Sequence, residues 1–296
     1  MVDYSRAFAL ERGMKGVTPM GYLRLMSHTC AANLAQLFEL RGALLATTSA
    51  CTSGSQALGA GFEQIRFGLQ DLMVCGGAEE LHEIEVGVFD MMFATSVRHE
   101  EPFATPRPFD ADRDGLVVGE GAATLVLEEL EHARSRGAPL LGEVVGYATR
   151  CDGRHPTAPD PAGMEATMRQ ALCVAEAAPE EVDWVCAHAT ATPAGDLAES
   201  RAMAAVYGSG VPVSSLKGHL GHALGACGAL EAWMALGMLR EGWVAPTLHL
   251  ARVDPACAEL DYVMGGVREL PLELIVSNNS AFGGVNTSLV FRRIDG

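Results

Sequence analysis

Short apolar segments alternate with longer segments of helical spacing along most of the chain, and this alternation restricts the fold more than any other feature. Each apolar segment has the length and residue types of a buried strand, and a helix-like segment usually follows it. Such alternation is typical of α/β proteins, whose mostly parallel sheets are buried on both faces. We predict strands at 43–50, 71–77, 121–127, 140–150 and 182–188, and helices within 20–41, 54–69, 128–137, 162–178 and 195–208.

The best candidate for a domain boundary is the Gly137-Ala138-Pro139 turn. A glycine that ends a charged helix, followed closely by a proline, marks a change of direction in the backbone. Strands and helices follow one another in the same rhythm on both sides of this turn. We therefore predict two related halves, residues 1–138 and residues 139–296.

The composition excludes several classes of protein. Of the 296 residues 49% are hydrophobic, which suits one or two large cores and not a disordered chain. The formal net charge of −16 argues against nucleic acid or an anionic membrane surface as the main partner. No apolar run reaches the roughly 18 residues of a membrane span, and the N-terminus does not resemble a signal peptide. We therefore predict a cytoplasmic protein without a membrane span.

One of the eight cysteines has an unusual setting. The cysteines form no CxxC pair, and most lie in apolar segments, so we expect reduced core residues. Cys51, in TTSACTSGSQALG (47–59), instead lies among small and hydroxyl residues where a predicted strand gives way to a helix. It is either an inert core residue or a nucleophile, whose thiol pKa the N-terminus of the helix would lower.

Three further polar segments interrupt the apolar pattern. In CAHATATPAGD (186–196), His188 follows a strand, where it is either a satisfied structural histidine or a functional one. In SSLKGHLGHALGACGALEA (214–232), His219 and His222 have no acidic or thiol ligand at a matching spacing, so we predict no metal site. The glycines of SNNSAFGGVN (277–286) are typical of a tight turn between strands. Each segment is ambiguous by itself.

Together, the four segments in this order resemble the motifs of the β-ketoacyl-acyl carrier protein synthases of the thiolase superfamily, from about residue 20 to the end. The resemblance implies a thiolase-like α/β fold, in which two related halves with mixed, mostly parallel sheets form αβαβα layers. A Cys-His-His set is the pattern of elongating synthases. Thiolases have a second cysteine and initiating synthases an asparagine in place of the second histidine.

The resemblance implies a decarboxylative Claisen condensation of an acyl thioester with a malonyl thioester. Cys51 would accept the acyl chain, and His188 and His222 would donate hydrogen bonds to the malonyl carbonyl oxygen. The backbone N–H groups of Cys51 and Phe282 would form the oxyanion hole, with the Phe282 ring gating the acyl pocket. Lys217, with Glu231 as its partner, would fix the orientation and charge of His222.

The remaining carried-over residues concern the substrate channel. Thr190 and Thr192 match hydroxyls that bind the phosphopantetheine arm of the carrier, and Asp196 and Glu199 match acidic residues behind the first histidine. A second mobile loop that lines this channel would include Asp152, His155 and Thr157, and the gating loop would include Gly283 and Gly284. No metal or organic cofactor is implied beyond the carrier's own phosphopantetheine.

Departures from the family pattern affect the gate. Ser280-Ala281-Phe282 replaces the common Phe-Gly-Phe, which removes one ring and one flexible glycine. Ala189 stands where many relatives have glycine, a change that is tolerated if the backbone there is not at positive φ. GHLGHALGACG resembles a branch associated with aryl-capped polyene chains, which leaves fatty acid, polyene and polyketide pathways open.

The implied partners are an acyl carrier protein and a second ketosynthase-like subunit, in a homodimer or a heterodimer. Alternative interpretations are a non-catalytic chain-length subunit, an inactive fragment, and a thiolase acting on coenzyme A esters. Cys51 and both histidines argue against the first. No cysteine takes the place of His222 and none lies near 282, which argues against the last. Compared with the family, the chain lacks the N-terminal portion, so we expect the natural gene product to continue upstream of Met1.

Overall fold

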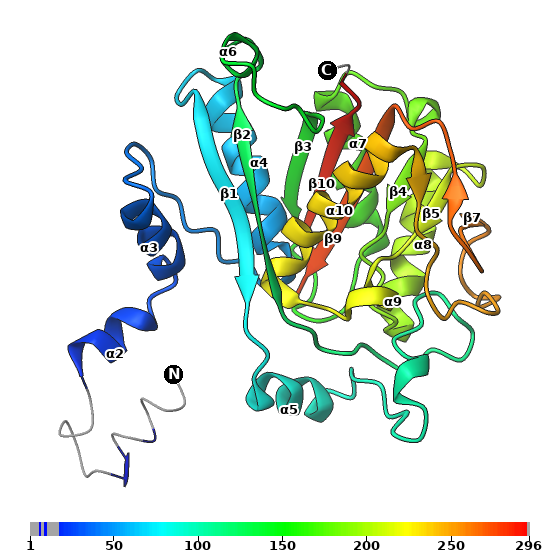
Figure 1. The fold of residues 1–296 in the computed structure, drawn as a ribbon. Coiled ribbons are helices and arrows are strands. Elements are labelled where there is room, and N and C mark those ends of the chain that lie inside the picture. The colour runs from blue at the N-terminus through cyan, green and yellow to red at the C-terminus, as the bar shows by residue number, and fades with distance from the viewer. Residues whose placement is uncertain (1–5, 7–8, 11–17, 295–296) are drawn as a thin grey trace. The chain divides into compact units, whose positions relative to one another are not determined.

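The computed structural model describes residues 6, 9–10 and 18–294 and divides into two compact units, residues 1–48 and 49–296 (Figure 1). The described part of the first unit contains the helices α2 (Pro19–Arg24) and α3 (Thr29–Leu37). Thr18 caps α2, because its hydroxyl accepts a hydrogen bond from the Gly21 N–H at 3.0 Å. Both helices match the helical segment predicted around 20–41.

The strand predicted at 43–50 is wrong. Residues 43–49 form no regular element, and the side chains of Leu44 and Leu45 are 45% and 48% exposed. A strand needs a neighbouring strand for its N–H and C=O groups. Among the described residues none pairs with this segment. Its apolar residues alone do not make it a strand.

The second unit contains the rest of the regular structure. Its helices are α4 (Ser53–Arg66), α5 (Glu83–Met91), α6 (Leu130–Ser135), α7 (Pro161–Val174), α8 (Pro193–Tyr207), α9 (Lys217–Leu220) and α10 (Cys227–Glu241), with short 3₁₀ turns η2 (Ala50–Thr52), η3 (Pro102–Ala104), η4 (Pro179–Glu181) and η5 (Leu224–Ala226). Its strands are β1 (Leu72–Glu79), β2 (Gly121–Glu128), β3 (Glu143–Cys151), β4 (Trp184–Cys186), β5 (Pro212–Ser214), β6 (Trp243–Val244), β7 (Asp261–Tyr262), β8 (Arg268–Glu269), β9 (Leu274–Ala281) and β10 (Val285–Arg292).

The main sheet has six strands in the order β3-β10-β9-β4-β5-β7. The pairs β3–β10 and β10–β9 are antiparallel, whereas β9–β4, β4–β5 and β5–β7 are parallel. Two further sheets are antiparallel pairs, β1–β2 and β6–β8. The thiolase-like α/β fold with mixed sheets is confirmed. The expectation of mostly parallel strands is wrong, since four of the described pairs are antiparallel and three are parallel, and β1 pairs with β2 antiparallel along its whole length.

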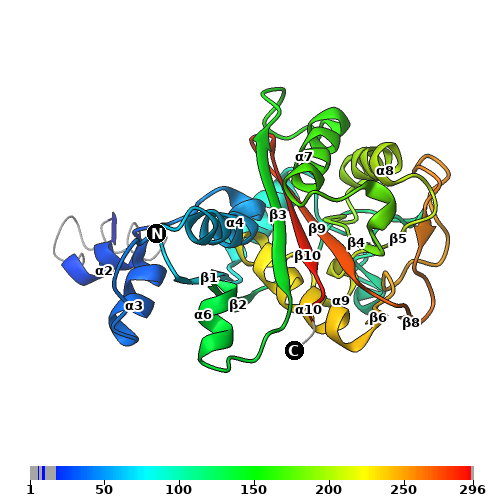
Figure 2. The same cartoon turned by 90° about the horizontal axis from the view of Figure 1, so that it is seen from above.

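Helices cover both faces of the main sheet (Figure 2). α7 and α8 lie on one face, and α10 and α4 lie on the other, between this sheet and the β1–β2 pair. Successive residues of β9 point to opposite faces: Ile275 joins the core beneath α10, and Val276 joins the core beneath α7 and α8. Burial on both faces explains the uninterrupted apolar start of this strand.

No helix in the described part of the chain is long and apolar enough to cross a membrane. The site described next lies where the first turn of α4, the C-terminal half of β9 and the start of α10 approach one another.

Candidate active site

Cys51 lies in a sharp turn, η2, immediately before α4. The preceding residue, Ala50, has a positive φ of 48°, which is uncommon for a residue other than glycine and marks a constrained turn. Hydroxyl groups hold this turn: Thr52 donates to the Ser49 carbonyl at 2.8 Å, and Ser53 donates to the Ala50 carbonyl at 2.7 Å. The hydroxyl residues around Cys51 therefore shape the backbone that carries the sulfur.

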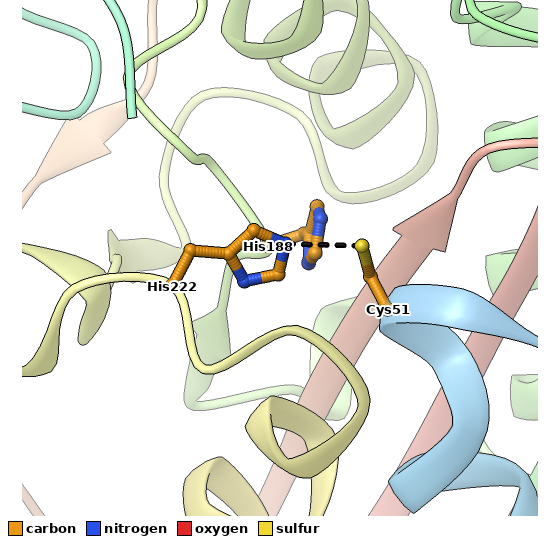
Figure 3. A group of neighbouring side chains, drawn as sticks. All are labelled: Cys51, His188 and His222. Atoms are coloured by element: carbon orange, nitrogen blue, oxygen red, sulfur yellow. Dashed lines mark hydrogen bonds between the residues drawn. The ribbon is translucent and has the colours of Figure 1, made fainter. Parts of the chain in front are cut away.

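The turn brings the Cys51 sulfur to two histidines that lie far away in the sequence (Figure 3). The Nε2 of His222 lies 3.0 Å from Sγ, and the ring centres of His188 and His222 are 5.1 Å apart with their planes at 87°. All three side chains are buried. The structure thus joins the three residues that the sequence predicted to act together.

Each histidine is held through its backbone. The His222 N–H donates to the Val117 carbonyl at 2.7 Å, and its carbonyl accepts from the Gly119 N–H at 3.0 Å. The Glu199 carboxylate accepts from the N–H groups of His188 at 2.8 Å and Ala189 at 2.7 Å. Ala189 is not among the residues with positive φ, so its methyl group brings no backbone strain.

Asp196 and Glu199 support this loop. Asp196 accepts from the N–H groups of Phe109 at 2.7 Å and Ala191 at 3.1 Å, and both carboxylates are fully buried. Burial raises the pKa of Asp196 to about 6 and that of Glu199 to about 7, although the backbone donors oppose the shift. Backbone donors thus occupy the oxygens of both carboxylates, which lie behind the first histidine as the resemblance implied.

Lys217 and Glu231 form a buried ion pair. Burial lowers the pKa of the Lys217 ammonium, but the Glu231 carboxylate outweighs this effect and raises it overall, so the lysine is charged. This positive charge is one cause of the low pKa of both histidines. The Lys217 charge therefore helps to keep both histidines neutral.

The protonation states follow from burial. Burial raises the pKa of the Cys51 thiol to about 12, and the Lys217 charge offsets this only in part. The lower pKa expected at a helix N-terminus is therefore not found, because desolvation outweighs the helix dipole. Burial also lowers the pKa of His188 and of His222 well below the usual range, so both rings are neutral at pH 7.

The residues expected along the substrate channel lie on loops. The hydroxyls of Thr190 and Thr192 are 3.0 Å apart just before α8. The His155 ring accepts from the Thr157 N–H at 3.2 Å within an exposed loop. That loop also contacts the gating loop, because Asp152 donates its N–H to the Gly284 carbonyl at 2.9 Å.

The loop predicted to gate the acyl pocket connects β9 and β10. Gly283 and Gly284 have φ values of 87° and 73°, which a side chain would disfavour. Phe282 is 41% exposed and stacks on Phe89 of α5, with 5.8 Å between the ring centres. The aromatic ring of the gate therefore rests on a helix that the sequence analysis did not connect with it.

Sequence reasoning missed two residues of the site. Asn279 lies within the quoted glycine-rich motif and contacts both Glu231 and His188, and Cys227 donates from its sulfur to the Cys51 carbonyl at 3.3 Å. Both residues lie inside the polar segments of the sequence, but only the fold shows that they contact Cys51, His188 and Glu231. His219 lies apart, since its Nε2 lies 2.8 Å from the Pro246 carbonyl.

Two family models match the chain: the β-ketoacyl synthase N-terminal domain over residues 3–133 and the β-ketoacyl synthase C-terminal domain over residues 141–251. The boundary predicted at 138/139 falls between these ranges, whereas residues 49–296 pack as one unit across it. That boundary stays a prediction.

Individual proteins show the same similarity. 3-Oxoacyl-[acyl-carrier-protein] synthase 1 of Haemophilus influenzae is 37% identical over 96% of this chain and 70% of its own length. The crystal structure of a β-ketoacyl synthase from Burkholderia phymatum is 52% identical, with a TM-score of 0.97 over 100% of this chain and 73% of that one.

Two solved complexes are also similar. One contains a type II PKS ketosynthase (AntDE) with its acyl-carrier protein (AntF), at 30% identity and a TM-score of 0.94 over 99% of this chain and 74% of that one. The other contains the ketosynthase ApeO with its chain length factor ApeC from Xenorhabdus doucetiae, at 27% identity and a TM-score of 0.85 over 99% and 72%.

Proposed function

The chain belongs to the β-ketoacyl synthase family and is a 3-oxoacyl-acyl carrier protein synthase, and we propose that Cys51, His188 and His222 divide its condensation reaction among them. The observation that carries this proposal is the 3.0 Å contact between Cys51 Sγ and His222 Nε2, with His188 beside them. In a decarboxylative condensation, the enzyme first takes up an acyl chain and then joins it to a malonyl unit.

In the first half-reaction, Cys51 attacks the acyl thioester. Because the buried thiol is protonated, the attack requires a proton acceptor, and neutral His222 presents Nε2 at hydrogen-bond distance. A bond forms between Sγ and the acyl carbon, and the bond from that carbon to the phosphopantetheine sulfur breaks. The proton passes from Sγ through Nε2 to the departing sulfur. Backbone N–H groups of Cys51 and Phe282 would stabilise the tetrahedral oxyanion.

In the second half-reaction, both histidines donate hydrogen bonds from Nε2 to the thioester oxygen of the malonyl unit. Loss of CO₂ leaves an enolate, whose charge these two donors stabilise in a site shielded from water. The enolate carbon then attacks the acyl carbon, and the Cys51 thiolate leaves. Lys217 and Glu231 support this step from behind the histidines and do not touch the substrate.

The channel residues would guide the carrier's phosphopantetheine arm. Thr190 and Thr192 offer hydroxyls beside the first histidine, and the loop with Asp152, His155 and Thr157 borders the gate. An acyl carrier protein as partner is supported by the solved ketosynthase complex that contains one. A second ketosynthase-like subunit is supported by the complex with a chain length factor. We propose a cytoplasmic setting, a homodimer or heterodimer, and no cofactor beyond the carrier's own arm.

The proposal is tested with the variants His188→Ala and His222→Ala. Self-acylation of Cys51 is followed by intact mass, and decarboxylation by release of CO₂ from malonyl carrier protein. We expect both variants to lose about 10²–10³-fold in decarboxylation. His188→Ala should acylate at close to the wild-type rate, whereas His222→Ala should acylate more slowly, with the loss shrinking at high pH.

The matched control is His219→Ala, which removes a neighbouring histidine whose Nε2 lies at the Pro246 carbonyl and not at the sulfur. It should retain both half-reactions. Release of CO₂ at the wild-type rate from either active-site variant would remove that histidine from the mechanism.

A further inference from the structure

Asn279, near the end of β9, connects the buried ion pair to the first histidine. Its amide nitrogen lies 2.6 Å from an oxygen of Glu231 and 3.3 Å from Nδ1 of His188. Its amide oxygen accepts a hydrogen bond from the Ser55 hydroxyl at 2.9 Å. The side chain is buried, with 1% of the residue exposed, so water does not compete for these contacts.

The orientation of the amide is fixed by its neighbours. Glu231 is a carboxylate paired with the Lys217 ammonium, so it accepts hydrogen bonds and cannot donate. A flipped amide would place its oxygen 2.6 Å from a carboxylate oxygen, which is repulsive. The amide nitrogen must therefore face Glu231, and the same nitrogen then faces His188.

The amide nitrogen determines which nitrogen of His188 carries the proton. An amide nitrogen donates two hydrogen bonds and accepts none. One hydrogen serves Glu231. The other is directed to His188 Nδ1 at 3.3 Å in preference to the Cys227 sulfur, which is a weaker acceptor and lies farther away at 3.7 Å, so Nδ1 is unprotonated. The buried ring is neutral, so its single N–H proton lies on Nε2.

We propose that Asn279 is a positioning residue that fixes His188 in the tautomer with the proton on Nε2. This inference rests on the proposed function, because it explains how His188 can only donate to the malonyl oxygen. It also leaves Nε2 without a lone pair for a metal, although the sulfur and one nitrogen from each histidine lie within 4.8 Å of one another.

His222 differs in this respect. Its Nδ1 is buried without a hydrogen-bond partner among the described residues, and its Nε2 faces the Cys51 thiol, so once the sulfur is acylated no donor fixes the tautomer of this ring. The ring can accept the Cys51 proton in the first half-reaction and donate from Nε2 in the second. His188 therefore only donates a proton in a hydrogen bond, whereas His222 both accepts and donates, because Asn279 contacts His188 and not His222.

The test measures the tautomer directly. Protein labelled with ¹⁵N-histidine gives two-bond ¹H–¹⁵N spectra in which the protonated ring nitrogen is identified, and the His188→Ala variant assigns the signal. In the wild-type protein we expect His188 to be protonated on Nε2. A wild-type ring protonated on Nδ1 would overturn the proposal without any variant being needed.

Two variants then test the cause. Asn279→Asp replaces the amide nitrogen with a carboxyl oxygen, whose proton is held between it and the Glu231 carboxylate, so this oxygen presents a lone pair to His188 and should move the His188 proton to Nδ1. Asn279→Ala should leave a mixture of tautomers. Both should lose about 10²-fold in decarboxylation and keep most of their self-acylation. Ser277→Ala, two residues away on β9, makes none of these contacts and should match the wild-type protein in both assays.

The two ideas fail in different ways. If the spectra of folded variants show no change of tautomer, Asn279 does not position His188, whatever the activity. If the tautomer changes as expected but decarboxylation does not, the assignment of His188 under the proposed function is wrong and Asn279 still fixes its tautomer.

Discussion

Lys217→Met tests whether the charge of the buried ion pair is needed to keep the site folded. Methionine retains the apolar stem, but Glu231 is left charged and unpaired, with its side chain 2% exposed. Breaking a buried pair by removing one partner costs about 3–5 kcal/mol, a large share of a typical folding free energy of about 5–15 kcal/mol. We therefore expect the free energy of unfolding to fall by about 3–5 kcal/mol at pH 8.

The assay is equilibrium unfolding in urea, monitored by circular dichroism, for Lys217→Met, Glu231→Leu and the double variant. Removing both charges leaves only the amide of Asn279 without its acceptor, which costs about 1–3 kcal/mol. The double variant should therefore be more stable than Lys217→Met. Arg240→Met, in a pair whose side chains are 58% and 55% exposed, should change stability by less than about 1 kcal/mol.

A second expectation concerns acidity. In Lys217→Met the pKa of Glu231 should rise, because its neutral form is favoured when buried alone, so the loss of stability should shrink as the pH is lowered. The reasoning is refuted if the double variant loses the sum of the two single losses, since such additivity would mean that the two charges do not interact.

Three other predictions concern single residues. An epoxyamide inhibitor or an acyl carrier thioester should modify Cys51 and no other cysteine, and peptide mapping that places the label on buried Cys75 or Cys227 would contradict this. Gly228→Ala should destabilise the protein by about 1–3 kcal/mol, since the new methyl carbon would lie 2.6 Å from the Ser55 hydroxyl and 2.7 Å from the Asn279 oxygen. Gly237→Ala in the same helix places its methyl carbon with nothing within 4 Å, so it should stabilise the protein in a thermal melt. Glu199→Gln should flatten the pH dependence of the free energy of unfolding. Burial raises the pKa of Glu199 in the folded protein from 4.5 to about 7, so the stabilisation from this group is full below pH 4.5 and is lost as the pH rises to about 7, a difference of about 3 kcal/mol. An unchanged slope in the variant would contradict this.

The sequence by itself determined the α/β class, most elements and the family. Strands such as β1 and β3 and helices such as α4 and α7 are recognisable because local spacing of apolar residues reports burial directly. The family motifs predicted that Cys51, His188 and His222 act together, and the fold brings their side chains together. The apolar spacing and the motifs each depend on residues close together in the sequence, so both can be seen without a structure.

The strand expected at 43–50 shows where such local information ends. An apolar segment becomes a strand only if another strand lies beside it, and the pairing partner is not encoded in the segment itself. The antiparallel pairing of β1 with β2 also could not be predicted from either segment, since it joins residues about fifty positions apart in the sequence.

Only the tertiary structure decided the protonation states in the site. A helix N-terminus favours a thiolate, but burial raises the Cys51 pKa to about 12, and the depth of burial depends on elements that are remote in the sequence. Likewise, the sequence shows Asn279 only as a polar residue in a glycine-rich motif, whereas the fold places its amide between Glu231 and His188. Residue types therefore follow from the sequence, whereas desolvation and hydrogen-bond direction depend on which distant groups the fold brings together.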